Sequence, residues 1–248
     1  MNFKLEICVD SIESAINSQT GGAHRVELCD NLAEGGTTPS YGTILTVRKN
    51  LGIRLHVIIR PRGGDFLYSP REYEIMQRDT EMCRELGADG IVTGILNKNG
   101  SVDIERMRGL VKAAGSMDVT FHRAFDMCSD PIKGLEDIIL TGATRILTSG
   151  QKNTVPGGAE LIRKLVDQAD GRIIIMPGGG LDESNIKDMA RITGANEFHL
   201  TGRKVVESDM KFHRNDIHMG GFPDIPEFSR KVADPERIRK IIKFLNQL

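Results

Sequence analysis

The chain has 248 residues, of which 39% are hydrophobic and 27% are charged. This composition is sufficient for a sizeable core and excludes a disordered chain. The 33 basic and 34 acidic side chains give a net charge of −1. The charge balance therefore offers no basic surface for nucleic acid or anionic lipid, and neither is expected as a partner.

The sequence contains no apolar run long enough to span a membrane, and no charged and then apolar leader follows Met1. We therefore expect a cytoplasmic protein without a membrane partner. The four cysteines, Cys8, Cys29, Cys83 and Cys128, are far apart and form no C-x-x-C pair. In a cytoplasmic chain such cysteines are more often free thiols than a disulfide framework.

A short apolar segment, a glycine-rich or polar turn and a helical pattern recur eight times. Strands are expected at residues 3–9, 24–29, 55–60, 90–95, 119–122, 145–148, 172–176 and 197–200. The first helix is expected to start at Asp10 or Ser11, and the second to end near residues 51–52. The next two are expected to span 70–86 and 103–114, and the fifth to start near Pro131 after the cap Asp130. The last three are expected to span 158–168, to begin at the cap Asp182 and to span 235–248.

This alternation predicts βαβ units and a parallel sheet. Eight such units in one chain of this length fit a single (β/α)8 TIM-type barrel over residues 1–248. A doubly wound open sheet is the alternative, but no G-x-G-x-x-G motif opens the first helix. The segment 202–233 interrupts the alternation, and we expect no strand in it. Such a long excursion after the eighth strand is expected to shape the site or an oligomer interface.

The third strand ends in a cluster of arginines and glycines. Pro61 terminates the strand, because proline cannot donate to a ladder. Arg60 and Arg62 flank this proline, and residues 63–65 are Gly-Gly-Asp. Fixed cations beside permissive glycines at the end of a buried strand indicate a ligand site. A solvated turn whose arginines pair with nearby acids is the alternative interpretation.

The alternation of the strands places ionisable side chains inside the barrel, because the aliphatic residues of 5–8 and 26–29 suit the helix side. The inward set, extended in phase to the third, fifth and eighth strands, is Glu6, Cys8, Glu27, Cys29, His56, Ile58, Arg60, Thr120, His122 and His199. Barrel interiors are usually filled with branched aliphatic residues, and unpaired buried charges are costly. We therefore expect these acids, arginines and histidines to pair as a network that marks a functional site.

Within this set, Glu27, Arg60 and His122 are the candidates for general acid–base catalysis. Histidine titrates near neutrality, and a neighbouring carboxylate would fix its tautomer. A structural ion-pair lattice that holds the strand register is the alternative interpretation.

Two other segments have the composition of an anion site. Gly178, Gly179 and Gly180 form a helix-entry turn after the seventh strand, where bare backbone N–H groups suit a phosphate or carboxylate. Arg203 follows the eighth strand, which supplies the other half of the usual barrel phosphate site. Arg62 is expected to face the same cavity. A tight turn that requires glycine is the alternative interpretation of the triple glycine.

Cys8 and Cys29 come from neighbouring strands, which run about 5 Å apart. Thiolates are the soft ligands that select Cu(I) or zinc. Two cysteines without a close partner motif are, however, more often small buried apolar residues. The spacing alone leaves both interpretations open.

Over nearly its whole length the chain resembles the CutC family of copper homeostasis proteins. The phrases that carry the resemblance are VELC at 26–29, EGGTTPS at 34–40, RPRGGDF at 60–66, TFHRAFD at 120–126 and TSGQK at 148–152. The resemblance implies a cytoplasmic TIM-type barrel, usually a homo-oligomer, that serves copper tolerance and binds Cu(I). It also implies that copper binds to cysteines near the barrel mouth, and the matching positions are Cys8 and Cys29.

Two functions of different class are therefore expected. The first is a cytoplasmic Cu(I)-binding homeostasis protein that uses Cys8 and Cys29. The second is a barrel enzyme of unknown reaction that acts on a small anionic or phosphorylated metabolite through Glu27, Arg60 and His122.

Overall fold

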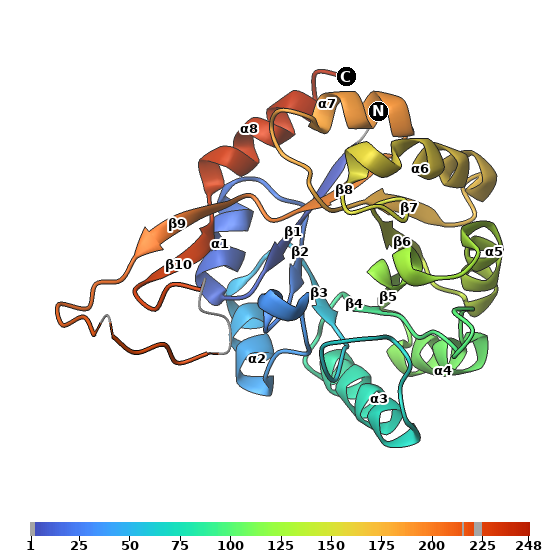
Figure 1. Cartoon of the computed structure of the whole chain (residues 1–248), viewed down its shortest axis with the longest axis horizontal. Coiled ribbons are helices and arrows are strands. Elements are labelled where there is room, and N and C mark those ends of the chain that lie inside the picture. Colours follow the sequence, from blue (N-terminus) through green and yellow to red (C-terminus); the bar gives the residue numbers. More distant parts are fainter. Residues whose placement is uncertain (1–2, 215, 221–224) are drawn as a thin grey trace.

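The computed structural model describes residues 3–214, 216–220 and 225–248. Strands and helices alternate along the chain, and Figure 1 shows the helices arranged as a ring around the strands. Eight parallel strands form one sheet in the order β7-β6-β5-β4-β3-β2-β1-β8. They are β1 (Lys4–Val9), β2 (Arg25–Leu28), β3 (Arg54–Ile58), β4 (Gly90–Thr93), β5 (Asp118–Phe121), β6 (Arg145–Thr148), β7 (Ile174–Pro177) and β8 (Glu197–Leu200). The predicted (β/α)8 barrel is therefore confirmed.

The helices lie close to their expected positions. They are α1 (Ile12–Thr20), α2 (Tyr41–Asn50), α3 (Pro70–Glu85), α4 (Ile104–Ala114), α5 (Pro131–Thr141), α6 (Val155–Ala169), α7 (Ile186–Thr193) and α8 (Pro235–Leu245). Two short 3-10 helices, η1 (Leu32–Glu34) and η2 (Arg123–Met127), follow β2 and β5. No helix of the described residues is long and apolar enough to cross a membrane.

Local sequence explains where most helices begin. Ser11 caps α1, and Asp130 caps α5 immediately before Pro131, as the sequence predicts. Before α3, Ser69 and Glu72 exchange hydrogen bonds in a capping box. The expected cap Asp182 is wrong, because α7 begins at Ile186 after Asn185. Asp182 instead accepts hydrogen bonds from the backbone and hydroxyl of Ser184 in the preceding turn.

The strands separate an apolar layer from a polar interior. The apolar core lies between strands and helices and includes fully buried Ile7, Leu28 and Phe198. Burying one such side chain contributes about 1.5–3 kcal/mol. On the other side of the same strands lie buried ionisable residues such as Glu6 and Glu27. The alternation expected from the sequence therefore positions a polar site inside a scaffold held by apolar packing.

The barrel closes between β7 and β8, the two ends of the strand order. Across the described residues, the backbone pairing between these strands is one parallel bridge from Gly178 to His199. On its other edge β8 pairs regularly with β1, where His199 lies opposite Glu6. His199 therefore lies at the join of the barrel.

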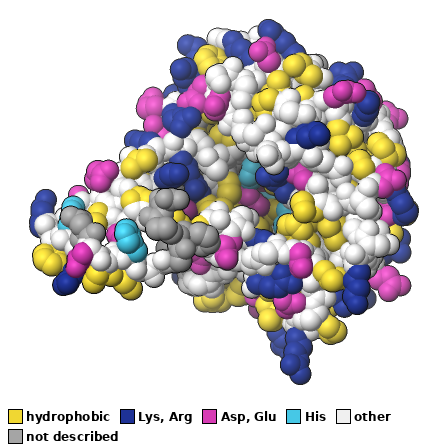
Figure 2. Space-filling model, viewed as in Figure 1, with side chains coloured by type: hydrophobic (Ala, Val, Ile, Leu, Met, Phe, Trp, Pro, Cys, Tyr) yellow, Lys and Arg dark blue, Asp and Glu magenta, His cyan; other side chains and the backbone are white. Residues whose placement is uncertain are grey.

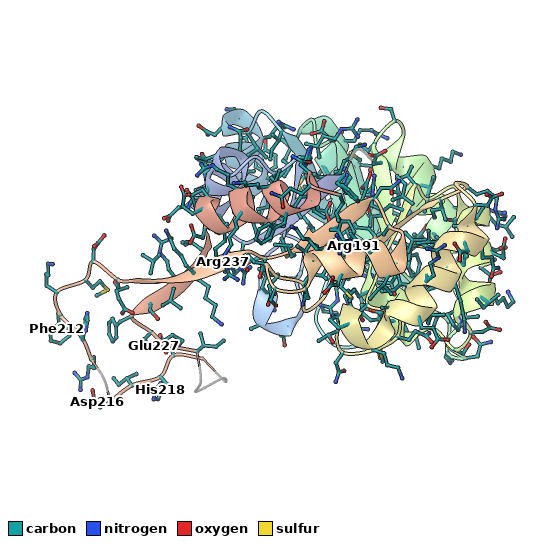
Figure 3. The ribbon with its side chains drawn as sticks, turned by 90° about the horizontal axis from the view of Figure 1, so that it is seen from above. Arg191, Phe212, Asp216, His218, Glu227 and Arg237 are labelled. Carbon is teal, nitrogen blue, oxygen red and sulfur yellow. The ribbon has the colours of Figure 1, made fainter. Side chains whose placement is uncertain are left out.

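The excursion after β8 contains two strands, so the expectation of no strand in 202–233 is wrong. β9 (Arg203–Glu207) pairs antiparallel with β10 (Ser229–Ala233). The hairpin and the described residues between its strands extend away from the barrel as an arm (Figures 1 and 3). Several apolar side chains on this arm face solvent, with Phe212 71% and Met219 82% exposed. The predicted long excursion is therefore present, with a different local structure.

Candidate functional site

A buried lattice of ion pairs lies inside the barrel. Arg25 Nη2 donates to Glu197 Oε2 at 2.7 Å, and its Nε pairs with Glu6. Arg145 Nε also donates to Glu197 Oε2 at 2.7 Å. Burial raises the pKa of Glu197, but Arg145 and Arg25 outweigh this effect and hold it below its usual value. A network of buried charges is therefore present and includes the expected Glu6, but its cations are Arg25 and Arg145. The expected arginine, Arg60, donates to backbone carbonyls instead.

Sequence analysis missed Arg25, Arg145 and Glu197 as members of this lattice. A signal was available for Arg25, because it precedes Glu27 by two residues and so shares its side of β2. Arg145 and Glu197 are the first residues of β6 and β8 and lie near the strand ends.

Four side chains meet beside this lattice, three from β1, β2 and β8 and one, Cys29, from the residue after β2. Cys8 Sγ lies 3.8 Å from Cys29 Sγ. One donor atom each from Cys8, Glu27 and His199 lie within 4.8 Å of one another. His199 is held in position by Glu6, whose Oε1 lies 2.7 Å from Nδ1 of the histidine. This Cys8 cluster is defined as Cys8, Cys29, Glu27 and His199.

Electrostatics favour a thiolate at Cys8. Cys29 is the hydrogen-bond partner that lowers the pKa of Cys8 to about 5; burial opposes this shift, and His199 and Arg203 add to it. The same hydrogen bond, together with burial, raises the pKa of Cys29 well above its usual value. Cys29 therefore remains the thiol of the pair, and its S–H group donates the hydrogen bond to the sulfur of Cys8.

The pKa values of the other two members of the Cys8 cluster are shifted toward the protonated forms. Burial, followed by the charge of Cys8, raises the pKa of Glu27 well above its usual value. Burial alone would lower the pKa of His199, but Cys8 and Glu6 raise it well above the usual value. These shifts favour a thiolate at Cys8, an imidazolium at His199 and a neutral carboxyl group at Glu27. Such a set can bind a soft cation after releasing protons, or can transfer protons to a substrate.

The donor set fits a soft metal ion. Two sulfur atoms each about 2.3 Å from a tetrahedral ion lie about 3.8 Å apart, which matches the separation of Cys8 and Cys29. The two possible ligand groups, Cys8 with Cys29 and Cys8 with Glu27 and His199, share only Cys8. Cys29 also packs against Ile58 in a small apolar cluster with Leu32.

Arg60 and His122 form a second group, next to Phe66. The Arg60 guanidinium carbon lies 5.3 Å from the centre of the Phe66 ring. The Phe66 and His122 ring centres are 5.0 Å apart. Of the three candidates for acid–base catalysis, the structure therefore brings Arg60 and His122 together, whereas Glu27 belongs to the Cys8 cluster. Figure 2 shows a hollow near the centre of the ring of helices, where acidic, basic and histidine side chains are visible.

The glycines of the seventh loop are used in a tight turn. Gly179 and Gly180 have φ values of +113° and +71°, which favour glycine. A Cβ atom on Gly178 would lie 2.5 Å from Leu147 Cδ1 and 3.0 Å from His199 Cβ. Steric demand therefore accounts for the three glycines, and their role toward an anion stays a prediction.

The two arginines predicted to bind an anion lie in different places. Arg62 pairs with Glu72 at 2.6 Å and Asp65 at 3.0 Å. Arg203 lies 3.4 Å from Asp10 and lines two cavities of ≈300 Å³ and ≈730 Å³ at the base of the arm. Figure 3 shows Arg237 in the same region, on α8. Arg203 thus remains near a cavity, whereas Arg62 is engaged by two carboxylates.

Fold and site together define a (β/α)8 barrel with a thiolate–histidine–carboxyl cluster on its inner wall. The model of the CutC family matches residues 3–204. The chain belongs to this family. A CutC family protein of Bacteroides thetaiotaomicron is 51% identical over 242 residues, which cover 97% of each chain. A human protein named copper homeostasis protein cutC homolog is 45% identical over 239 residues, covering 96% of this chain and 88% of the human one.

Solved structures agree with this assignment. The crystal structure of the putative copper homeostasis protein CutC from Streptococcus agalactiae has a TM-score of 0.77 and 38% identity, and covers 80% of this chain and 98% of that one. Phosphoribosylanthranilate isomerase from Thermotoga maritima has a TM-score of 0.60 at 14% identity, covering 99% of this chain and 100% of that chain. This second likeness shows the barrel fold alone.

Proposed function

We propose that this CutC-family protein binds Cu(I) through Cys8 and thereby serves copper homeostasis. The observation that carries the proposal is the pair of sulfur atoms 3.8 Å apart, with a histidine and a carboxyl group beside them. Copper is here the cargo of the protein. The names of the human and Streptococcus agalactiae relatives, which refer to copper homeostasis, support the same role.

The chemistry of the Cys8 cluster supports a soft, monovalent cargo. A thiolate favours Cu(I) over harder ions, and imidazole is a common additional ligand for copper. Because Cys8 already carries negative charge at neutral pH, binding there requires no proton release from this sulfur.

We also propose that the protein works in the cytoplasm, since thiolate binding of Cu(I) needs reduced cysteines and this compartment keeps thiols reduced. All four cysteines are free thiols in the structure, as the sequence predicts. The homo-oligomer expected from the family resemblance stays a prediction, which light scattering on the purified protein would check.

The test is a Cu(I) competition titration with a strong chelator on the fully reduced protein. Wild type is expected to remove copper from the chelator, whereas the double variant Cys8→Ser/Cys29→Ser fails to do so. The matched control is Cys83→Ser/Cys128→Ser, which alters two other buried cysteines and is expected to behave as wild type. Equal copper binding by wild type and the Cys8/Cys29 variant would overturn the proposal.

A second candidate function is a barrel enzyme that acts on a small anionic metabolite. The observation that favours it is the position of Arg60 and His122, two buried residues that flank Phe66 and have no part in the Cys8 cluster. In this proposal the site is formed by Arg60 and His122, and Glu27 remains a member of the Cys8 cluster. Its test is turnover or binding of phosphorylated and carboxylated metabolites, lost in His122→Asn.

A further inference from the structure

Three buried polar atoms near Phe66 have no hydrogen-bond partner among the described residues. They are Arg60 Nε, Tyr68 Oη and His122 Nε2. The residues that carry them are only 4%, 3% and 5% exposed, respectively. A buried polar group without a partner costs about 1–3 kcal/mol, so three such atoms in one region need an explanation.

All three atoms can donate a hydrogen bond, and the phenol oxygen of Tyr68 can also accept one. Nδ1 of His122 accepts the backbone N–H of Ala124 at 3.2 Å. Because burial and the neighbouring Arg60 lower the pKa of His122 to about 3, its ring is neutral and its single proton is on Nε2. Burial also raises the pKa of Tyr68 to about 12, so the phenol keeps its proton. Arginine is always protonated.

The three residues belong to one region of the barrel. The Arg60 guanidinium acts on both of the others, because its charge lowers the pKa of His122 and opposes the rise at Tyr68. The ring of Phe66 lies against both Arg60 and His122. Phe66 and Tyr68 lie in the loop between β3 and α3, whereas His122 immediately follows β5.

The charge of Arg60 is not neutralised by a carboxylate within this group. Its Nη1 donates to the carbonyl oxygens of Glu34 and Gly36 at 2.9 and 2.7 Å, and its Nη2 donates to that of Gly64 at 2.9 Å. These backbone partners fix the orientation of the guanidinium while they leave its positive charge and its Nε–H available.

We propose that Arg60, Tyr68 and His122 bind one oxyanion, the carboxylate or phosphate group of a small metabolite. A single water molecule could accept from Arg60 Nε and His122 Nε2 and donate to Tyr68 Oη, but it would leave the buried charge of Arg60 without a counter-ion. A carboxylate or phosphate accepts three hydrogen bonds and also neutralises Arg60. This inference deepens the second candidate function, since it names the residues that hold the anion. It does not depend on copper binding at Cys8.

The probes are inorganic phosphate, sulfate and acetate, which separate the two kinds of oxyanion. Each is titrated into reduced protein whose histidine rings carry nitrogen-15, and the His122 signals are assigned with His122→Asn. That variant has a side-chain oxygen in place of Nδ1 as acceptor for Ala124, but it lacks the Nε2 donor. At least one of the three anions is expected to shift the His122 signals to saturation and to raise the thermal unfolding midpoint.

Tyr68→Phe separates a binding role from a structural one. Since Tyr68 Oη has no hydrogen-bond partner in the described part of the chain, its removal is expected to leave the unfolding midpoint unchanged or higher and to weaken anion binding by about fivefold or more. Tyr73→Phe is the matched control, because Tyr73 Oη donates to the Arg106 carbonyl at 3.0 Å. This control is expected to lower the midpoint and to leave anion binding unchanged.

Three results would overturn the inference. They are the absence of a saturable shift with all three anions, binding of equal strength in Tyr68→Phe and wild type, and a loss of stability in Tyr68→Phe as large as that in Tyr73→Phe. Cys8→Ser is expected to keep anion binding, and Tyr68→Phe is expected to keep copper binding. Failure of the anion site and failure of the copper site can therefore be distinguished, whereas failure of the enzyme alone would leave anion binding intact without turnover.

Discussion

The sulfur atoms of Cys8 and Cys29 are 3.8 Å apart. Cys8 belongs to both possible metal-ligand groups, whereas Cys29 belongs to only one of them. Its S–H group stabilises the Cys8 thiolate. The two cysteines that the sequence presents as equivalent are therefore different in the folded protein. Cys8 is the donor that both possible ligand groups share, although both cysteines pack against Ile58 in the same small apolar cluster.

The two cysteines are expected to contribute unequally to copper binding. Cys8→Ser removes the ligand common to both groups and is expected to abolish competition with the chelator. Cys29→Ser leaves Cys8, Glu27 and His199 and is expected to weaken binding by about 10- to 100-fold, as for a supporting residue. Competition titration of the single variants is the measurement. Equal losses in both would show that the two sulfur atoms alone make the site.

Arg25 is expected to be essential for stability because it lies between Glu6 and Glu197. Arg25→Met leaves both carboxylates buried with fewer partners, and the free energy of unfolding should fall by about 3–5 kcal/mol. Urea denaturation measures this change. Arg54→Ala is the control, since Arg54 pairs with Asp118 at 2.9 Å but is 61% exposed, and its loss should cost less than about 1 kcal/mol. Similar losses for both variants would contradict the prediction.

Stability is expected to fall with acid before the carboxylates titrate. Burial lowers the pKa of His56 to about 3. Below its unfolded pKa of about 6.5, the unfolded chain binds a proton that the folded chain does not. Each such histidine therefore lowers the free energy of unfolding by about 1.4 kcal/mol per pH unit as the pH falls toward 5.

His56→Leu is expected to reduce that slope by the contribution of one histidine and to leave the remaining slope to residues such as His122. Urea midpoints between pH 6.5 and 5 are the measurement, with wild type and His213→Leu compared in parallel. His213 is exposed on the arm, so its variant is expected to keep the full slope. An unchanged slope in His56→Leu would show that its ring is protonated in the folded protein.

Gly178→Ala is expected to disturb the join of the barrel. The new Cβ would press on Leu147 and His199, which should cost about 1–3 kcal/mol of stability and weaken copper binding through His199. Gly157→Ala in α6 is the control. Its nearest neighbour, Lys152 Cβ, would lie at 3.6 Å, and the substitution should stabilise the helix by up to about 1 kcal/mol. A stable Gly178→Ala protein with normal copper binding would contradict the steric argument.

The sequence predicts most of the barrel because the information is local. Alternating apolar residues in β1 and β2 identify both the strands and their inward side, and caps such as Ser11 and Asp130 mark the helix starts. The hairpin was missed because β9 is largely exposed and its residues, such as Lys204 and Val205, lack a buried stripe. Its partner β10 follows after a long intervening segment, so the pairing leaves no local pattern.

The sequence predicts which residues face the barrel interior better than it predicts where each of them lies within the site. Inward phase identifies Glu27, Arg60 and His122 but does not give their positions around the barrel, so it could not separate the Cys8 cluster from the group at Phe66. Tyr68 lies on a loop, where strand alternation does not apply. It was identified only in the fold, where its buried hydroxyl has no hydrogen-bond partner among residues 3–214, 216–220 and 225–248. Arg62 was predicted to bind an anion because the sequence does not show that Glu72, ten positions later, pairs with it in the fold.

The bridge between Gly178 and His199 connects closure of the barrel to occupation of its site. His199 holds β8 to β7 through its backbone and reaches the Cys8 cluster through its ring. A ligand that binds to this ring is therefore expected to stabilise the closed barrel, because a ligand that binds only the closed form stabilises that form by mass action. Ligand binding at the Cys8 cluster and the resistance of the barrel to opening between β7 and β8 are therefore thermodynamically coupled.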